Sequence, residues 1–397
     1  MLKAGTVLIF RWRPIVSKRR IDLTKPDLTG REIAYLQACL GSMRISGDGP
    51  FTAKCHDLLA RQYGRPVLLT HSCTAALEMA AMLLVGPGDE VILPSFTFVS
   101  TANAFVLRGA TPVFVDIRQD TLNIDERLLE AAIGPRTRAI VPVHYAGIGC
   151  DMDAIMRIAY RHDIAVVEDA AQGYLAKWRG KPLGSFGNCG ALSFHETKNV
   201  VSGEGGLLIL NDPALNRRAH IIREKGTNRT EFLRGEVVKY EWLDIGSSFL
   251  PSDLVAAVLL AQLEEAEEIT DRRLALWDHY HALLSPLEEA GHLKRPTVPD
   301  GAQHNGHIYY IIFPTTGRRD EARARLRAAG IEASTHYVPL HSAPAGLRFG
   351  RVSGSMEVTD RIATTMLRLP LHGGLGKEDV EQVTHILTDA LASGDHA

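Results

Sequence analysis

The chain contains 397 residues, of which 45% are hydrophobic and 23% are charged, the composition of a soluble globular protein. A chain of this length exceeds one ordinary hydrophobic core, so two domains are expected. The 44 basic and 46 acidic residues leave a net charge of −2. This balance favours neither a nucleic acid nor a membrane surface as a partner.

The cysteines and histidines form no recognisable disulfide or metal pattern. The five cysteines are scattered and odd in number, which indicates reduced thiols in a cytoplasmic protein. The pairs His279/His281 and His304/His307 lack accompanying thiolates or carboxylates, so no metal site is expected. Residues 1–20 are basic, with an apolar run too short to span a bilayer and no cleavage site. We expect a disordered N-terminal extension and not a signal peptide.

The first expected helix follows a Thr-x-x-Glu capping pattern. Thr29 and Glu32 have the spacing of a capping box, which marks the start of a helix. The apolar positions of this helix are Ile33, Leu36 and Leu40. A glycine- and proline-containing turn follows at 46–50.

Strands and helices then alternate for much of the chain. Strands that are nearly all apolar, separated by helical stretches, predict an α/β domain with a mostly parallel sheet covered on both faces. We assign this large domain to residues 21–255. The seven expected strands lie at 66–70, 90–94, 111–115, 138–143, 163–167, 190–194 and 205–210. The expected helices lie near 74–85, 97–107, 125–133 and 151–162.

The last third of the sequence has a different pattern of charged and apolar residues. A long, charged, helix-forming stretch covers 256–290, and 307–313 alternates as a strand. Two amphipathic helices are expected at 319–329 and 377–392. These elements predict a smaller α+β C-terminal domain at 256–397.

A carboxylate and a lysine follow two of the expected strands. A β-branched run delivers Asp169 to the carboxyl edge of the sheet, and Lys198 lies in the segment after a later strand. Most single lysines between polar residues are solvated surface groups. Together, however, the two side chains suit pyridoxal phosphate, because the lysine forms a Schiff base and the aspartate pairs with the protonated pyridine nitrogen.

Three weaker features are typical of a site for a phosphorylated ring. Residues 69–77 leave a strand and enter a helix through hydroxyl residues, where free N–H groups bind anions, although a plain N-cap is the alternative. Phe96 ends the next strand and is placed to stack on a flat ring, although such a residue is more often core. Ser193 adds a hydroxyl shortly before Lys198.

In this order the motifs resemble the sugar aminotransferases of the DegT/DnrJ/EryC1/StrS family, from about residue 21 to the C-terminus. The family resemblance is carried by residues 72–77, 167–172, 193–199 and 203–206. Within the family the chain is most similar to the dTDP-4-amino-4,6-dideoxygalactose transaminases of enterobacterial common antigen synthesis. That narrower similarity is carried by residues 100–110, 223–229, 244–253 and 336–341.

The resemblance implies fold type I of the transferases that depend on pyridoxal phosphate (PLP), with a seven-stranded sheet in the large domain. It implies transfer of an amino group from L-glutamate to dTDP-4-dehydro-6-deoxy-D-glucose, giving dTDP-4-amino-4,6-dideoxy-D-galactose and 2-oxoglutarate. Lys198 would hold the cofactor and move the proton, Asp169 would keep the pyridine protonated, and Gln172 would contact the ring 3-oxygen. The remaining expected cofactor contacts are ring stacking by Phe96 and phosphate binding by Ser193, Thr74 and the backbone of Cys73 and Ala75.

One segment departs from the family pattern. Where most members carry an asparagine that reaches the cofactor phosphate of the neighbouring subunit, this chain has Ser248, and Leu250 replaces an arginine. The subgroup shares the serine pair, so the resemblance implies a homodimer in which Ser248 completes the partner's site. The alternative is that this loop only packs.

Other functions remain open at this stage. The chain resembles an aminotransferase for a 3- or 4-keto nucleotide sugar in general, and motifs do not encode which sugar. A sugar 3-dehydratase of the same family would carry histidine in place of Lys198. A non-catalytic regulator that binds pyridoxal phosphate is the alternative from a different class, but no helix-turn-helix or basic patch is evident.

Overall fold

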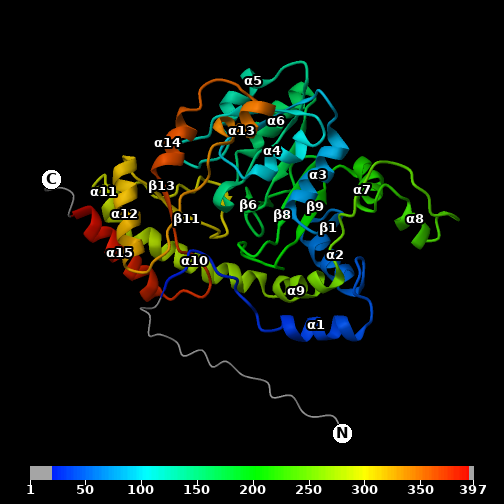
Figure 1. The fold of residues 1–397 in the computed structure, drawn as a ribbon, viewed down its shortest axis with the longest axis horizontal. Helices are drawn as coiled ribbons and strands as arrows, with labels where there is room; N and C mark the ends of the chain where they lie inside the picture. Colours follow the sequence, from blue (N-terminus) through cyan, green and yellow to red (C-terminus); the bar gives the residue numbers. More distant parts are fainter. Residues whose placement is uncertain (1–19, 393–397) are drawn as a thin grey trace, which may run out of the picture.

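The protein is built around a central sheet of eight strands (Figure 1). The computed structural model describes residues 20–392, so the N-terminal extension expected at 1–20 lies outside this range except for Arg20. Across the sheet the strands are β1 (Val67–Thr70), β9 (Gly206–Leu210), β8 (Cys189–Ser193), β5 (Ala165–Asp169), β4 (Thr137–Ile140), β2 (Glu90–Pro94), β3 (Thr111–Val115) and β12 (Arg351–Val352).

The sheet is largely parallel, as predicted. Only β9 runs against its neighbours β8 and β1, and the other adjacent strands pair in parallel. The seven strands expected from the apolar runs are confirmed. The eighth strand, β12, was not predicted, because its two exposed residues carry no alternation of apolar and polar side chains.

Helices cover both faces of this sheet. Side chains of β2 show why the strands are apolar throughout, since Ile92 faces one core while Val91 and Leu93 face the other, and all three are fully buried. The first core is completed by α2 (Pro50–Tyr63), α6 (Met152–His162) and α9 (Asp253–Leu263). The second is completed by α3 (Cys73–Leu84), α4 (Val99–Val106) and α7 (Asn216–Arg223).

The helix predicted from the capping pattern is present but begins later. In α1 (Glu32–Gly41), Glu32 is the first helical residue, and its carboxylate accepts the N–H groups of Thr29 at 2.8 Å and Gly30 at 2.9 Å. Only the glutamate half of the capping box is therefore formed. Ile33 and Leu40, from the predicted apolar side, are 70% and 53% exposed. Few side chains of the same chain therefore pack on this side of α1.

The C-terminal region has its own core around an antiparallel pair, β11 (Tyr309–Ile312) and β13 (Met366–Leu369). The predicted long helical stretch is divided, and the boundary expected after residue 255 falls inside α9, whose Leu259 and Leu260 pack in the large core. The division into domains stays a prediction. The helices of this region are α10 (Ala266–Leu283), α11 (Ser285–Glu289), α12 (Thr316–Ala328), α13 (Pro344–Phe349), α14 (Glu357–Thr365) and α15 (Lys377–Ala392).

Smaller elements complete the description. The helix expected at 125–133 is a 3-10 turn followed by the short α5 (Leu129–Ala132). A second small sheet joins β10 (Ala302–Gln303), β6 (Lys177–Trp178) and β7 (Lys181–Pro182), and α8 (Arg229–Leu233) lies on an arm that projects from the body (Figure 1). Across residues 20–392, no helix is both long and apolar enough to cross a bilayer.

Candidate active site

A cavity of about 450 Å³ lies at the carboxyl ends of the central strands. In an open α/β sheet, this edge is where ligands bind. The predicted residues Cys73, Thr74, Asp169, Gln172, Ser193 and Lys198 all line the cavity, although they come from three separate stretches of sequence. The C-terminal region closes it with His307, Ile308, His336, Tyr337 and Arg368.

Asp169 is the last residue of β5 and is held in one orientation. Its Oδ2 accepts a hydrogen bond from the Thr101 hydroxyl at 2.7 Å, and its Oδ1 accepts the Ala171 N–H at 3.1 Å. Thr101 in turn lies 2.8 Å from the hydroxyl of Thr97. The carboxylate is only 5% exposed. A buried carboxylate fixed in this way stabilises a cation placed in the cavity.

Lys198 lies in a loop that folds back after β8. The Lys198 N–H donates to the carbonyl of His195 at 2.9 Å, and Glu196 donates to Gly203 at 3.0 Å. Burial lowers the pKa of the Lys198 amine, while the nearby Cys73 and Asp169 act in the opposite direction. A lowered pKa enlarges the neutral fraction of the amine, which is the nucleophilic form.

The start of α3 forms the anion turn expected from the sequence, with one correction. Cys73 and Thr74 are the first helical residues, so their N–H groups precede the first hydrogen bond of the helix and face the cavity edge. The Ala75 N–H instead donates to the Ser72 hydroxyl at 3.1 Å, and Ala75 is fully buried. Ala75 therefore serves the N-cap, and the prediction that its backbone binds phosphate is wrong.

A glycine brings β9 close beneath this turn. A Cβ on Gly206 would lie 2.3 Å from the carbonyl carbon of Ser72 and 2.5 Å from the nitrogen of Cys73. Any side chain at this position would push the turn away from the sheet. The Thr74 hydroxyl is paired with Ser100 at 2.7 Å, and Ser193 reaches the cavity from the end of β8.

Gln172 has both ends of its amide engaged. Its Oε1 accepts the Ala146 N–H at 2.7 Å, and its Nε2 donates to the Tyr337 hydroxyl at 3.1 Å. The second Nε2 hydrogen is free to meet a ligand in the cavity. Contact with the ring 3-oxygen stays a prediction.

Of the two phenylalanines after β2, Phe98 lines the cavity and Phe96 does not. Phe96 is 1% exposed and packs against the rings of Tyr145, at 5.3 Å, and Tyr337, at 5.6 Å. The cavity is lined instead by Phe98, which is 57% exposed. The prediction for Phe96 is wrong, because the chain turns after Pro94 and buries Phe96 in the core.

Ser248 lies outside the cavity of its own chain. It is exposed, it pairs with Glu224 in an isolated bridge next to the C-terminal end of α7, and none of its atoms lines the cavity. The apolar side chains of Trp242, Leu243 and Ile245 are exposed as well. The expected role of Ser248 thus requires a second subunit and stays a prediction.

The structure adds residues that had no assigned role. His307 is 7% exposed, and its Nδ1 lies 2.9 Å from Oδ1 of Asn199. Because Asn199 uses its Nδ2 to donate to the carbonyl of Asn305, its Oδ1 accepts a hydrogen bond from the Nδ1–H of His307. Burial lowers the pKa of His307, so the ring is neutral. In the sequence, Thr101 and Tyr337 lie within segments that carry the family resemblance. His307 was considered only as a metal ligand, and no pattern in the sequence pointed to Arg368.

These residues fit pyridoxal phosphate. The cavity is lined by an anion turn, a fixed carboxylate and a desolvated amine. These groups suit the phosphate, the pyridine nitrogen and the aldehyde carbon of the cofactor. Within residues 20–392, no cluster of three or more His, Cys, Asp or Glu side chains is arranged to hold a metal ion.

Comparisons with known proteins agree with this chemistry. The DegT/DnrJ/EryC1/StrS aminotransferase family model matches residues 26–388. GDP-perosamine synthase of Caulobacter vibrioides is 33% identical over 379 residues, covering 94% of this chain and 98% of that protein. UDP-4-amino-4-deoxy-L-arabinose–oxoglutarate aminotransferase of Shewanella sediminis is 32% identical, covering 95% and 100%.

Solved structures show the same fold. The aminotransferase TlmJ of Streptoalloteichus hindustanus superposes with a TM-score of 0.87 at 32% identity, covering 94% of this chain and all of that one. The PLP form of the sugar aminotransferase Spr1654 of Streptococcus pneumoniae superposes with a TM-score of 0.86 at 27% identity, covering 94% and 99%. The chain therefore belongs to the DegT/DnrJ/EryC1/StrS family and is a sugar aminotransferase that depends on pyridoxal phosphate.

Proposed function

We propose that the enzyme transfers the amino group of L-glutamate to C4 of dTDP-4-dehydro-6-deoxy-D-glucose. The products are dTDP-4-amino-4,6-dideoxy-D-galactose and 2-oxoglutarate. The observation that carries the reaction type is the meeting of Lys198 and Asp169 in one cavity beside the anion turn of α3. The choice of sugar is supported by the subgroup motifs at 223–229, 244–253 and 336–341, and by a relative named for a UDP-linked 4-amino-4-deoxy sugar.

The roles of the residues follow from their positions. The bound cofactor supplies a carbonyl that carries the amino group and a ring that withdraws electrons. Lys198 holds the cofactor and moves the proton at the reacting carbon as general base and acid. Asp169, fixed by Thr101, keeps the pyridine nitrogen protonated. The turn at Cys73 and Thr74, with Ser193, orients the phosphate.

The active unit in this proposal is a homodimer with shared sites. Phe98, which lines the cavity, is 57% exposed in one chain, and Ser248 and the apolar Trp242 and Leu243 are exposed as well. A second copy would cover these apolar side chains and bring its Ser248 to the phosphate of the first. A serine hydroxyl donates a hydrogen bond to phosphate directly or through water.

The compartment we infer is the cytoplasm, where thiols stay reduced. The cysteines at 39, 55, 73, 150 and 189 are all free, and most of them are buried. No nucleic acid or membrane partner is part of the proposal.

The test is product analysis from dTDP-4-dehydro-6-deoxy-D-glucose and glutamate. Mass spectrometry and NMR should show one amine at C4 in the galacto configuration. An amine at C3, or the gluco configuration, would contradict the proposed product and favour another nucleotide-sugar aminotransferase. If glutamate did not bleach the absorbance of the bound cofactor, the result would instead favour a non-catalytic regulator that binds pyridoxal phosphate.

A further inference from the structure

His307 is a buried histidine of the active-site cavity with one ring nitrogen left unbonded. It precedes β11, lines the cavity and is 7% exposed. Asn199 donates with its Nδ2 to the carbonyl of Asn305, so its Oδ1 faces His307 and accepts the Nδ1–H at 2.9 Å. In the neutral ring Nε2 is therefore an acceptor, and it has no hydrogen-bond partner among residues 20–392. A buried acceptor of this kind is costly unless a group in the cavity meets it.

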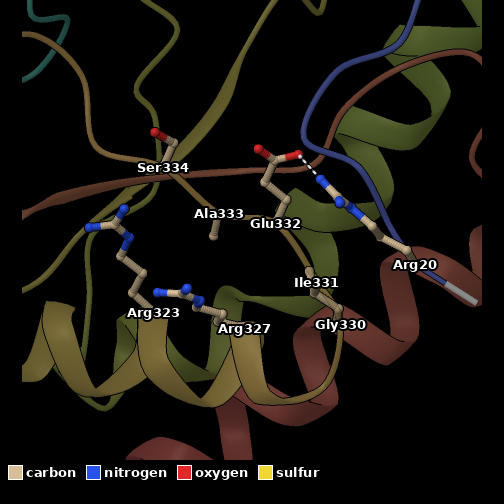
Figure 2. Close-up of a pocket in the computed structure, with 8 residues that line it drawn as sticks. All are labelled: Arg20, Arg323, Arg327, Gly330, Ile331, Glu332, Ala333 and Ser334. Carbon is tan, nitrogen blue, oxygen red and sulfur yellow. Dashed lines mark ion pairs between the residues drawn. The ribbon is translucent and has the colours of Figure 1, made fainter. Parts of the chain in front are cut away.

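The backbone that carries His307 is fixed by a buried arginine. Arg273 of α10 is 3% exposed and donates to the carbonyls of Gly306 at 3.1 Å and His307 at 2.8 Å. Figure 2 shows arginines in the opposite situation, since Arg323 and Arg327 of α12 are exposed to solvent at a surface cavity. Taking a guanidinium out of water is costly unless its N–H groups are bonded. The bonds from Arg273 therefore hold this main chain in one place.

The same segment joins the two loops that carry the reacting groups. Asn305 is 1% exposed, and its Nδ2 donates to the carbonyls of Gln172 and Tyr174, both at 2.8 Å. These carbonyls lie in the loop that follows β5. Asn199, which accepts the imidazole N–H, is the residue after Lys198. The imidazole is therefore fixed relative to the loop after β5 and to the loop of the lysine.

The Lys198 amine is a donor that lacks a partner in the same cavity. Its Nζ forms no hydrogen bond or ion pair within residues 20–392. The oxygens of Asp169 already accept hydrogen bonds from Thr101 and Ala171. Burial lowers the pKa of His307, and the positive charge of Lys198 is the next cause, so the two side chains interact electrostatically. A free donor and a free acceptor thus share the cavity.

We propose that His307 is a positioning residue for Lys198, and that its Nε2 accepts a hydrogen bond from the Lys198 amine whenever that amine is not bonded to the cofactor. A carboxylate in this place would hold the amine as an ammonium ion, which has no lone pair. A neutral imidazole orients one N–H of the amine and leaves the lone pair free to take a proton. The inference rests on the proposed role of Lys198 and not on the identity of the sugar.

The test is the equilibrium between the pyridoxal and pyridoxamine forms of the holoenzyme. It is read from the cofactor absorbance at fixed ratios of glutamate to 2-oxoglutarate. Lys198 is bonded to the cofactor in the first form and free in the second, so the proposed hydrogen bond stabilises the pyridoxamine form alone. In His307→Phe the equilibrium should move about threefold to tenfold toward the pyridoxal form, the effect of losing one hydrogen bond. Damage that affects both forms equally does not move it.

Single-turnover bleaching by glutamate gives a second readout. Its limiting rate should fall about tenfold to a hundredfold in His307→Phe, because a misplacement of about 1 Å can cost roughly 10²-fold, while the half-saturating glutamate concentration stays near wild type. His307→Gln should lie between the two proteins, since an amide can donate to Asn199 and accept from Lys198. The matched control is His304→Phe. His304 belongs to the same segment, packs against Trp277 and does not line the cavity, so this variant should match wild type.

Two results would overturn the inference. One is the same equilibrium in wild type and His307→Phe. The other is an equal shift in His304→Phe, because distortion of the segment would then explain both. If His307→Phe does not fold, the same criteria apply to His307→Ala. The measurement uses only glutamate and 2-oxoglutarate, so failure of the wild type to aminate dTDP-4-dehydro-6-deoxy-D-glucose would count against the proposed sugar alone. Absence of any bleaching in the wild type would contradict the proposed function and, with it, the inference.

Discussion

The inner and outer walls of the active-site cavity are built in different ways. On the inner wall, Asp169 is held by Thr101 and Ala171, and Gln172 is held between Ala146 and Tyr337. On the outer side, Phe98 is 57% exposed and Ser248 does not reach the cavity. One chain therefore preorganises the groups that do the chemistry. In the proposed dimer, Ser248 of a second chain would add to the phosphate side of the cavity.

The largest effect is expected for Lys198→Ala. The variant should bind the cofactor without covalent attachment and lose essentially all turnover, because general acid–base catalysis alone contributes roughly 10²–10⁴-fold and the covalent role is lost too. Absorbance spectra and steady-state rates measure both effects. Lys177→Ala, at an exposed lysine of β6 outside the cavity, is the matched control and should behave as wild type. Near wild-type transamination by Lys198→Ala would contradict the assignment.

The next largest effect is expected for Asp169. Asp169→Ala should stay folded but slow the glutamate half-reaction strongly, because each unit lost from the pyridine pKa is worth about 1.4 kcal/mol. Asp169→Asn keeps the shape and can still accept the Thr101 hydrogen bond, so it isolates the charge. Single-turnover bleaching by glutamate is the measurement. We expect both variants to be slow, and an unchanged rate in either would remove Asp169 from the proposed role.

In the proposed dimer, a substitution of Ser248 affects the site of the partner subunit, whereas a substitution of Lys198 affects the site of its own chain. Lys198→Ala and a bulky Ser248→Trp should each be inactive as homodimers. Mixed in equal amounts and refolded, they should regain up to about a quarter of wild-type activity, because half of the dimers are mixed and each has one intact site. A mixture no more active than its parents, or fully active dissociated monomers, would count against the shared site.

The same contrast separates what sequence can predict from what it cannot. Asp169 was predicted because a buried apolar run delivers it to the sheet edge, and Ser193 because it precedes Lys198 by a short interval. Arg368 was missed because it reaches the cavity through pairing of β13 with β11 and with Ser334. Such meetings of distant segments depend on tertiary packing, which no local pattern encodes.

Backbone detail explains the two site residues that were predicted wrongly. The Ala75 N–H belongs to the cap made by Ser72, a bond that a motif of small residues does not specify. For the aromatic, the sequence analysis named Phe96, whereas the residue that lines the cavity is Phe98, because the path of the chain after Pro94 buries Phe96. The fold class was predictable from long, repeated apolar runs, whereas these choices depend on single turns.

The smallest effect on turnover is expected for substitutions of Phe96 and Phe98. Comparing the two tests which ring belongs to the hydrophobic core and which to the cavity. Phe98→Ala removes a ring that faces the cavity, so it should weaken cofactor retention with little change in thermal stability, because stacking contributes about 0.5–1.5 kcal/mol. Phe96→Ala removes a fully buried ring next to Tyr145 and Tyr337 and should cost about 3–5 kcal/mol of unfolding free energy. The cofactor-saturated activity of the folded Phe96→Ala fraction should stay near wild type. Urea unfolding and cofactor dialysis measure the two properties on the same samples. If the stability loss followed Phe98 and the cofactor loss followed Phe96, the assignment of the two rings would be reversed.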